Sequence, residues 1–154
     1  DGVWFAMYES KNSTVALAAK LIFDEIERIK TTLVSDEDLE LAKNATIETL
    51  PSTFNSKAKT LSVFVSDEIT DQDPLYWETY RDKIRAVTKE DVMRVANRIL
   101  KPEEMYMLIV GNWGEIEAGD AGGRATMQDI HEIIGGSITE LPILDPLTLV
   151  LPSE

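Results

Sequence analysis

The sequence has no cysteine and a single histidine, His131. Without thiols the chain has no disulfide, no thiolate zinc site, no iron–sulfur cluster and no cysteine nucleophile. Catalytic zinc takes three protein ligands, usually including two or more histidines, so His131 does not complete such a site. His131 is also the only base available for a serine–histidine–aspartate triad, and no nucleophile elbow lies near it. We therefore expect no catalytic, cofactor-binding or metal-ligating residue in this chain.

Basic residues are scarce beside acidic ones: 15 Lys and Arg against 28 Asp and Glu give a net charge of −13. Such a surface repels phosphate backbones and anionic headgroups, which argues against nucleic-acid and membrane-surface binding. No hydrophobic run approaches the roughly 20 residues that a membrane span needs. The composition of the 154 residues, 44% of them hydrophobic, is that of a globular protein. Because the chain opens on Asp1-Gly2, we expect it to be cut from a longer protein.

Five segments repeat apolar residues every three or four positions, which is typical of amphipathic helices. They cover residues 14–30, 35–49, 54–69, a stretch that starts at 73–74, and 88–100, and a short sixth helix is predicted over 127–134. Two of the starts carry clear signals. Ser35 is followed by three acids that favour the positive end of a helix, and Thr88 with Asp91 forms a capping-box pattern.

Two segments are almost continuously apolar and end near a glycine or a polar cluster. Val3–Glu9 and Glu104–Val110 therefore predict strands covered on both faces. No strand-like segment separates the helices between them. Such segregation predicts an α+β fold, with helices packed on one face of a mostly antiparallel sheet. Because other strand-like runs are few, we expect this sheet to present unpaired edges that favour self-association or cover by another polypeptide.

Three clusters invite a functional interpretation. The acids between Asp67 and Asp73 lack the spacing of a calcium loop, so a solvated turn with a helix cap is favoured over a carboxylate site. Gly119–Gly123 contains no GK[ST] phosphate motif, which favours a loop. Seven basic residues between 81 and 101 form either an ordinary solvated face, which we favour, or a docking patch. These seven are Arg81, Lys83, Arg85, Lys89, Arg94, Arg98 and Lys101.

A set of phrases carries a family resemblance. These are SDEDLELAK at 35–43, LPSTF at 50–54, DPLYW at 73–77 and IRAVTKEDV at 84–92, with 86–111 continuing the last phrase. Together they resemble the C-terminal domain of pitrilysin/insulinase zinc metallopeptidases, in the bacterial processing-peptidase-like branch. The resemblance implies that residues 1–111 are part of such a domain, in truncated form, and that residues 112–154 are a tail punctuated by glycine and proline.

The resemblance implies that this portion is non-catalytic. The zinc-binding H-x-x-E-H motif of the family is absent from the chain, so zinc is expected in an upstream catalytic half, and Glu48 is given no metal role. The partners implied are that upstream half, in the same or a partner chain, and a peptide substrate in the parent enzyme. The implied compartment is bacterial and extracytoplasmic. An inactive assembly subunit and an independent carboxylate-based enzyme are the alternatives.

Overall fold

The structure is a computed structural model that describes residues 3–142 and 147, and within them every regular element is a helix. The predicted α+β fold is therefore wrong. Neither Val3–Glu9 nor Glu104–Val110 is a strand. The physical reason is the missing ladder: in the described part, neither Val3–Glu9 nor Tyr106–Val110 forms a backbone hydrogen bond. A strand exists only when a neighbour pairs with its backbone, and apolar composition does not supply that neighbour.

The chain divides into two compact units. The first joins residues 1–22 to 102–154, and the second comprises 23–101. Helix α1 (Val15–Thr31) begins in the first unit and ends in the second. Segments at the two ends of the described chain therefore fold together, with the helical block between them as a separate unit.

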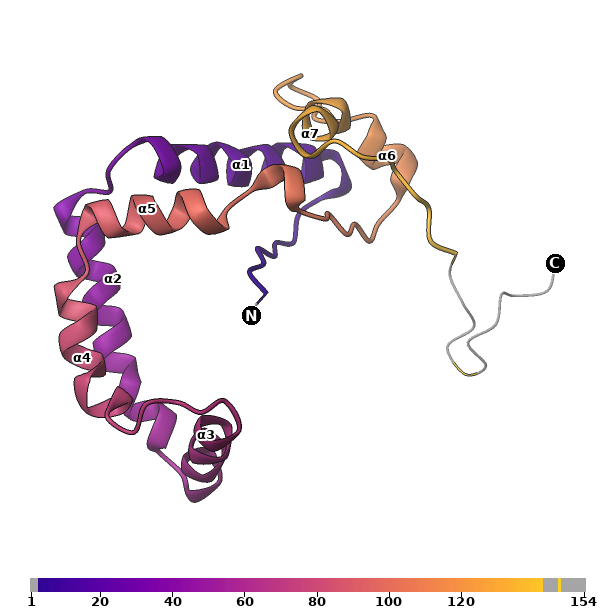
Figure 1. Cartoon of the computed structure of the whole chain (residues 1–154). Coiled ribbons are helices and arrows are strands. Elements are labelled where there is room, and N and C mark those ends of the chain that lie inside the picture. The colour runs from indigo at the N-terminus through magenta and orange to yellow at the C-terminus, as the bar shows by residue number, and fades with distance from the viewer. Residues whose placement is uncertain (1–2, 143–146, 148–154) are drawn as a thin grey trace. The chain divides into compact units, whose positions relative to one another are not determined.

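The second unit is built from helices connected by short turns (Figure 1). After the end of α1 come α2 (Asp36–Thr49), the 3-10 turn η2 (Leu50–Phe54), α3 (Lys57–Ile69), α4 (Tyr76–Ala86) and α5 (Lys89–Ile99). Helices α2 and α4 lie side by side, and η2 contacts both α2 and α3. The side-chain amide of Asn97 on α5 donates to the carbonyl of Lys30 at the end of α1, at 2.8 Å.

The helix starts follow the local signals in the sequence. Ser35 Oγ accepts a hydrogen bond from the Asp38 amide at 3.0 Å, and Thr88 forms the predicted capping box with Asp91. Helix α3 begins three residues later than the predicted 54, because Ser56 caps it after the η2 turn. Helix α4 begins at Tyr76, after Asp73 Oδ1 accepts from the Leu75 amide at 2.9 Å.

The second unit buries few side chains. Ile26 and Ala96, both at most 5% exposed, are its buried apolar residues. The other large contact is an aromatic cluster, in which the Trp77 ring meets Phe54 edge-on at a centroid distance of 5.2 Å and Tyr80 at 5.6 Å. A unit of this size with so small a core leaves much of its apolar surface in water.

The first unit has the better-packed core. It holds the 3-10 turns η1 (Asn12–Thr14) and η3 (Pro102–Glu104), and the helices α6 (Trp113–Glu117) and α7 (Met127–Ile134). Ile116 and Ile130 are each 1% exposed, the most deeply buried large side chains in the described residues. Helix α6 was not predicted, whereas α7 has the predicted bounds. The glycines of 112–134 therefore lie in a packed structure. The part of the predicted tail that covers residues 143–146 and 148–154 lies outside the described residues.

No helix of the described residues is long and apolar enough to cross a membrane, which agrees with the sequence-based expectation of no membrane span.

Candidate functional site

His131 lies on α7 and is half-buried. Within the described residues, no group of three His, Cys, Asp or Glu side chains could hold a metal ion. The His131 backbone carbonyl has a structural role, because it accepts the Gly135 amide at 2.7 Å where α7 ends.

The acidic cluster between Asp67 and Asp73 is occupied by structural contacts. Asp67 Oδ2 accepts a hydrogen bond from Trp77 Nε1 at 2.6 Å, which ties α3 to α4. Asp73 caps the turn before α4, as described above. Asp71 takes a positive φ of 51° in the tight turn that ends α3, a conformation that aspartate tolerates. These contacts support the solvated-turn interpretation.

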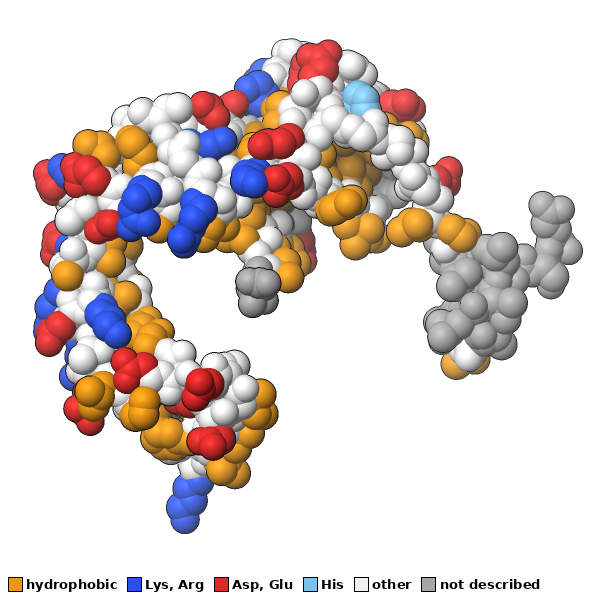
Figure 2. Space-filling model, viewed as in Figure 1, with side chains coloured by type: hydrophobic (Ala, Val, Ile, Leu, Met, Phe, Trp, Pro, Cys, Tyr) orange, Lys and Arg blue, Asp and Glu red, His pale blue; other side chains and the backbone are white. Residues whose placement is uncertain are grey.

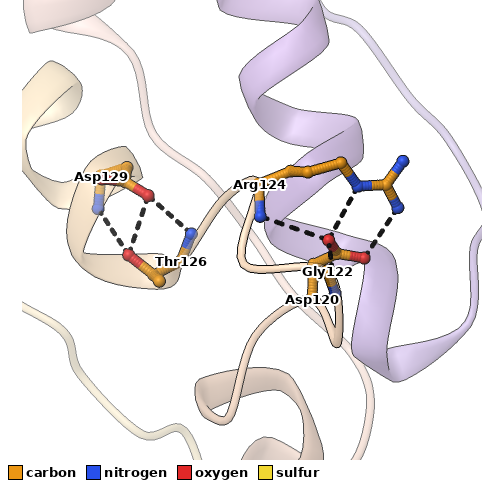
Figure 3. A network of polar contacts seen from close by, with 5 residues as sticks. All are labelled: Asp120, Gly122, Arg124, Thr126 and Asp129. Atoms are coloured by element: carbon orange, nitrogen blue, oxygen red, sulfur yellow. Dashed lines mark hydrogen bonds and ion pairs between the residues drawn. The ribbon is translucent and has the colours of Figure 1, made fainter.

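The glycine-containing loop at 119–123 is organised around Asp120 (Figure 3). Its carboxylate accepts from the Gly122 amide at 3.1 Å and from Arg124 Nε at 2.8 Å. The hydrogen bond from Arg124 is the main cause that lowers the pKa of Asp120 to about 2. The Asp120 side chain is 5% exposed. The amides of Gly122 and Arg124 donate to the Asp120 carboxylate, and the amides of Asp120 and Gly123 donate to backbone carbonyls. Because a phosphate is bound by free N–H donors, a loop that uses these donors internally closes a turn and is a poor phosphate cradle.

The next turn is a second capping box (Figure 3). Asp129 Oδ2 accepts from the Thr126 amide at 2.7 Å, and Thr126 Oγ1 accepts from the Asp129 amide at 3.2 Å. The hydrogen bonds from Thr126 lower the pKa of Asp129. The box starts α7 at Met127, which places Ile130 in the core. The network of Figure 3 is therefore structural.

Four of the basic residues between 81 and 101 contact acidic or aromatic side chains. Asp91 accepts from Arg94, and this bond is the main cause that lowers the pKa of Asp91 to about 2. Lys83 Nζ lies 5.5 Å from the centre of the Tyr76 ring. Three exposed ion pairs are Arg85 with Asp82 at 3.0 Å, Lys89 with Asp36 at 2.8 Å, and Arg94 with Asp91 at 2.7 Å. These contacts fit a solvated face better than a docking patch.

The segment Met105–Val110 stands out in the first unit. Tyr106, Leu108 and Val110 are 100%, 78% and 93% exposed, while Met105, Met107 and Ile109, which alternate with them, are half-buried. This alternation is the two-residue period of an extended chain with one covered face. The other face presents three large apolar side chains directly to water.

The opening segment repeats this pattern less regularly. Val3, Phe5 and Met7 are 89%, 74% and 85% exposed, whereas Trp4 and Tyr8 are better covered. Tyr8 anchors the segment, because its hydroxyl donates to the Val15 carbonyl at the start of α1, at 3.0 Å. Burial raises the pKa of the Tyr8 hydroxyl. The first unit therefore carries two extended, apolar and unpaired segments.

The second unit exposes apolar residues on α3. Figure 2 shows hydrophobic side chains gathered over this helix, and a shallow hollow beside it is lined by Phe54, Lys57, Leu61 and Phe64. The apolar residues of α3 that remain largely in water are Leu61, Phe64, Val65 and Ile69. Both units thus offer apolar surface of the kind that marks protein–protein contact.

Comparisons with protein-family models, with curated proteins and with solved structures found no match.

Proposed function

We propose that this chain is the non-catalytic C-terminal portion of a pitrilysin-like zinc metallopeptidase. Its role would be to form part of the substrate chamber by packing against an upstream catalytic half. The phrases at 35–43 and 84–92 support the proposal, since they coincide with the capped starts of α2 and α5. The absence of strands from the described residues departs from the fold that the resemblance implies, so the proposal rests on these phrases and on the exposed surface.

The exposed apolar surface is the observation that carries the proposal. Large apolar side chains face water on the extended segments of the first unit and on α3 of the second. Covering one such side chain fully is worth about 1.5–3 kcal/mol. A chain that leaves this surface uncovered gains more from a large partner than from any small ligand, which is what assembly against another polypeptide requires.

Catalysis has no support in the residues of this chain. With one histidine and no metal-holding group among the described residues, the zinc of the proposed parent would be held by the upstream half. There it would activate water for peptide hydrolysis. This chain's contribution is confinement and exclusion of bulk water, which position a peptide without touching the reacting atoms.

The alternative is an inactive assembly subunit related to the same family. The same exposed surface supports it, because a scaffold also needs a partner to cover its apolar residues. The two functions differ in whether association raises peptidase activity.

The test mixes the purified chain with the separately purified half that bears H-x-x-E-H and follows cleavage of a quenched fluorescent peptide. We expect the mixture to cleave faster than the upstream half alone. A matched variant, His131→Ala, is expected to give the same increase, because His131 supplies no ligand. Binding without any gain in cleavage supports the assembly subunit instead. Failure to bind refutes both.

A further inference from the structure

The segment Tyr106–Val110 is held extended at both of its ends. Before it, the Met105 amide donates to the Pro102 carbonyl at 3.1 Å and closes the η3 turn. After it, Gly111 lies so close to neighbouring groups that an added Cβ would come within 2.8 Å of Asn12 Oδ1 and 2.9 Å of Ile116 Cδ1. The segment between these two anchors is thus constrained before any partner arrives, which lowers the entropy cost of binding.

The backbone of this segment is open. Within the described residues, no hydrogen bond reaches the amides or carbonyls of Tyr106–Val110. An extended chain with free donors and acceptors pairs with another extended chain by strand addition. A helix presents no free backbone groups along its length, so it would leave these amides and carbonyls unpaired.

The side chains and charges around the segment specify the partner further. Tyr106, Leu108 and Val110 form one exposed apolar row, which alternate apolar side chains of an added strand would cover. Glu103 precedes the segment, and Glu115 follows it in the sequence. Basic residues at the ends of the added strand would complement these acids.

We propose that Tyr106–Val110 is a docking strand for an extended segment of another polypeptide, apolar at alternate positions and with Lys or Arg at its ends. The proposal deepens the proposed function, because it names the kind of segment with which the upstream half would bind this chain. It rests on the proposed function only in taking the upstream half as the polypeptide that carries this segment. The proposed backbone hydrogen bonds join two polypeptides, so the proposal does not require a sheet within this chain. A second copy of this chain is disfavoured because both copies would carry a net charge of −13.

The probe is a fluorescently labelled eight-residue peptide, with valine alternating with threonine and lysine at both ends, titrated with the full chain and followed by anisotropy. Three related peptides complete the set: one N-methylated at alternate residues to remove the donors of one edge, one N-methylated on the other edge, and one with glutamate at both ends. We expect one methylated peptide and the glutamate peptide each to bind at least tenfold more weakly than the parent. Binding should also slow amide exchange at 106–110.

The matched variants are Leu108→Pro and Leu141→Pro. Both positions are exposed and lie outside helices, but only proline at 108 removes an amide from the docking strand. We expect Leu108→Pro to lose binding at least tenfold and Leu141→Pro to bind like the unmodified chain, with helical circular dichroism unchanged in both.

The proposal is overturned if both methylated peptides bind as tightly as the parent, if exchange slows only elsewhere, or if the two proline variants bind alike. Concentration-dependent self-association that Leu108→Pro abolishes, without binding of the peptide, overturns it in favour of a second copy. None of these readouts involves peptide cleavage. The docking strand can therefore fail while the peptidase assembly succeeds, and the reverse.

Discussion

Truncating Ile130 to alanine tests whether residues 112–134 belong to a packed core. Ile130 is 1% exposed on α7 and is buried together with Ile116 of α6. Removing three carbons from a buried isoleucine typically costs about 2–5 kcal/mol, from lost burial and from the cavity left behind. Alanine recovers only a few tenths of that through its higher helix propensity, so the net change remains strongly destabilising.

Hydrogen exchange measures this change in the unit concerned. A loss of about 2–5 kcal/mol corresponds to roughly 30-fold to several-thousand-fold faster opening, up to the limit set by the total stability of the unit. We expect the amides of Met127–Ile134 and Trp113–Glu117 to exchange at least tenfold faster in Ile130→Ala. Amides of α4, which lies in the other unit, are expected to change little.

Ile138→Ala is the matched control. It makes the same chemical change at a side chain that is 64% exposed and lies beyond the end of α7. We expect exchange in α6 and α7 to stay within about twofold of the unmodified chain, because exposed truncations have small effects. Equal exchange in the two variants would refute the packed core of α6 and α7.

Three further substitutions probe contacts at single sites. The pKa of Asp120 lies at about 2, so its contribution to stability is full above the ordinary value of 3.8 and is lost as the pH falls toward 2. In the unmodified chain, hydrogen-exchange protection of α6 and α7 should therefore fall with pH in this range, and Asp120→Asn should make that fall smaller. An unchanged dependence of protection on pH would contradict this. Ala96→Asp places a carboxylate at a site that is 5% exposed and should lower the thermal unfolding midpoint by several degrees. Lys89→Ala on the same helix should change that midpoint little. Similar midpoints for the two variants would show that the buried and exposed faces of α5 are misassigned. Asp67→Ala leaves the indole Nε1–H of Trp77 without its acceptor and should shift the tryptophan emission spectrum, while an unchanged spectrum would contradict the α3–α4 link.

Local chemistry explains why the helices were predicted well. An N-cap hydroxyl, acids in the first turn and an apolar stripe all act within a few residues of one another, so they are visible in the sequence alone. Ser35, Thr88 and the short helix 127–134 are the clearest cases. The errors at the start of α3 and α4 are small, because turns that precede a cap delay the helix without removing its signal.

For the candidate sites, composition alone sets which chemistry is expected. The absence of cysteine and the single histidine already spoke against a zinc site, before any geometry was available. The sequence did not show that Asp67 pairs with Trp77, or that Asp120 closes a turn through Arg124. Those contacts depend on which helices meet and how a loop folds back, and no local spacing encodes them.

The apolar composition of Val3–Glu9 and Glu104–Val110 was determined by the sequence, and so was their preference for an extended backbone. Whether each becomes a strand was decided by tertiary structure, since a strand needs backbone partners from elsewhere in space. The described residues supply none, so both segments remain extended and unpaired. A helix pairs each backbone amide with a carbonyl four residues away in the same segment, whereas a strand needs backbone partners from a distant segment. For this reason the helices could be predicted from the sequence and the absence of strands could not.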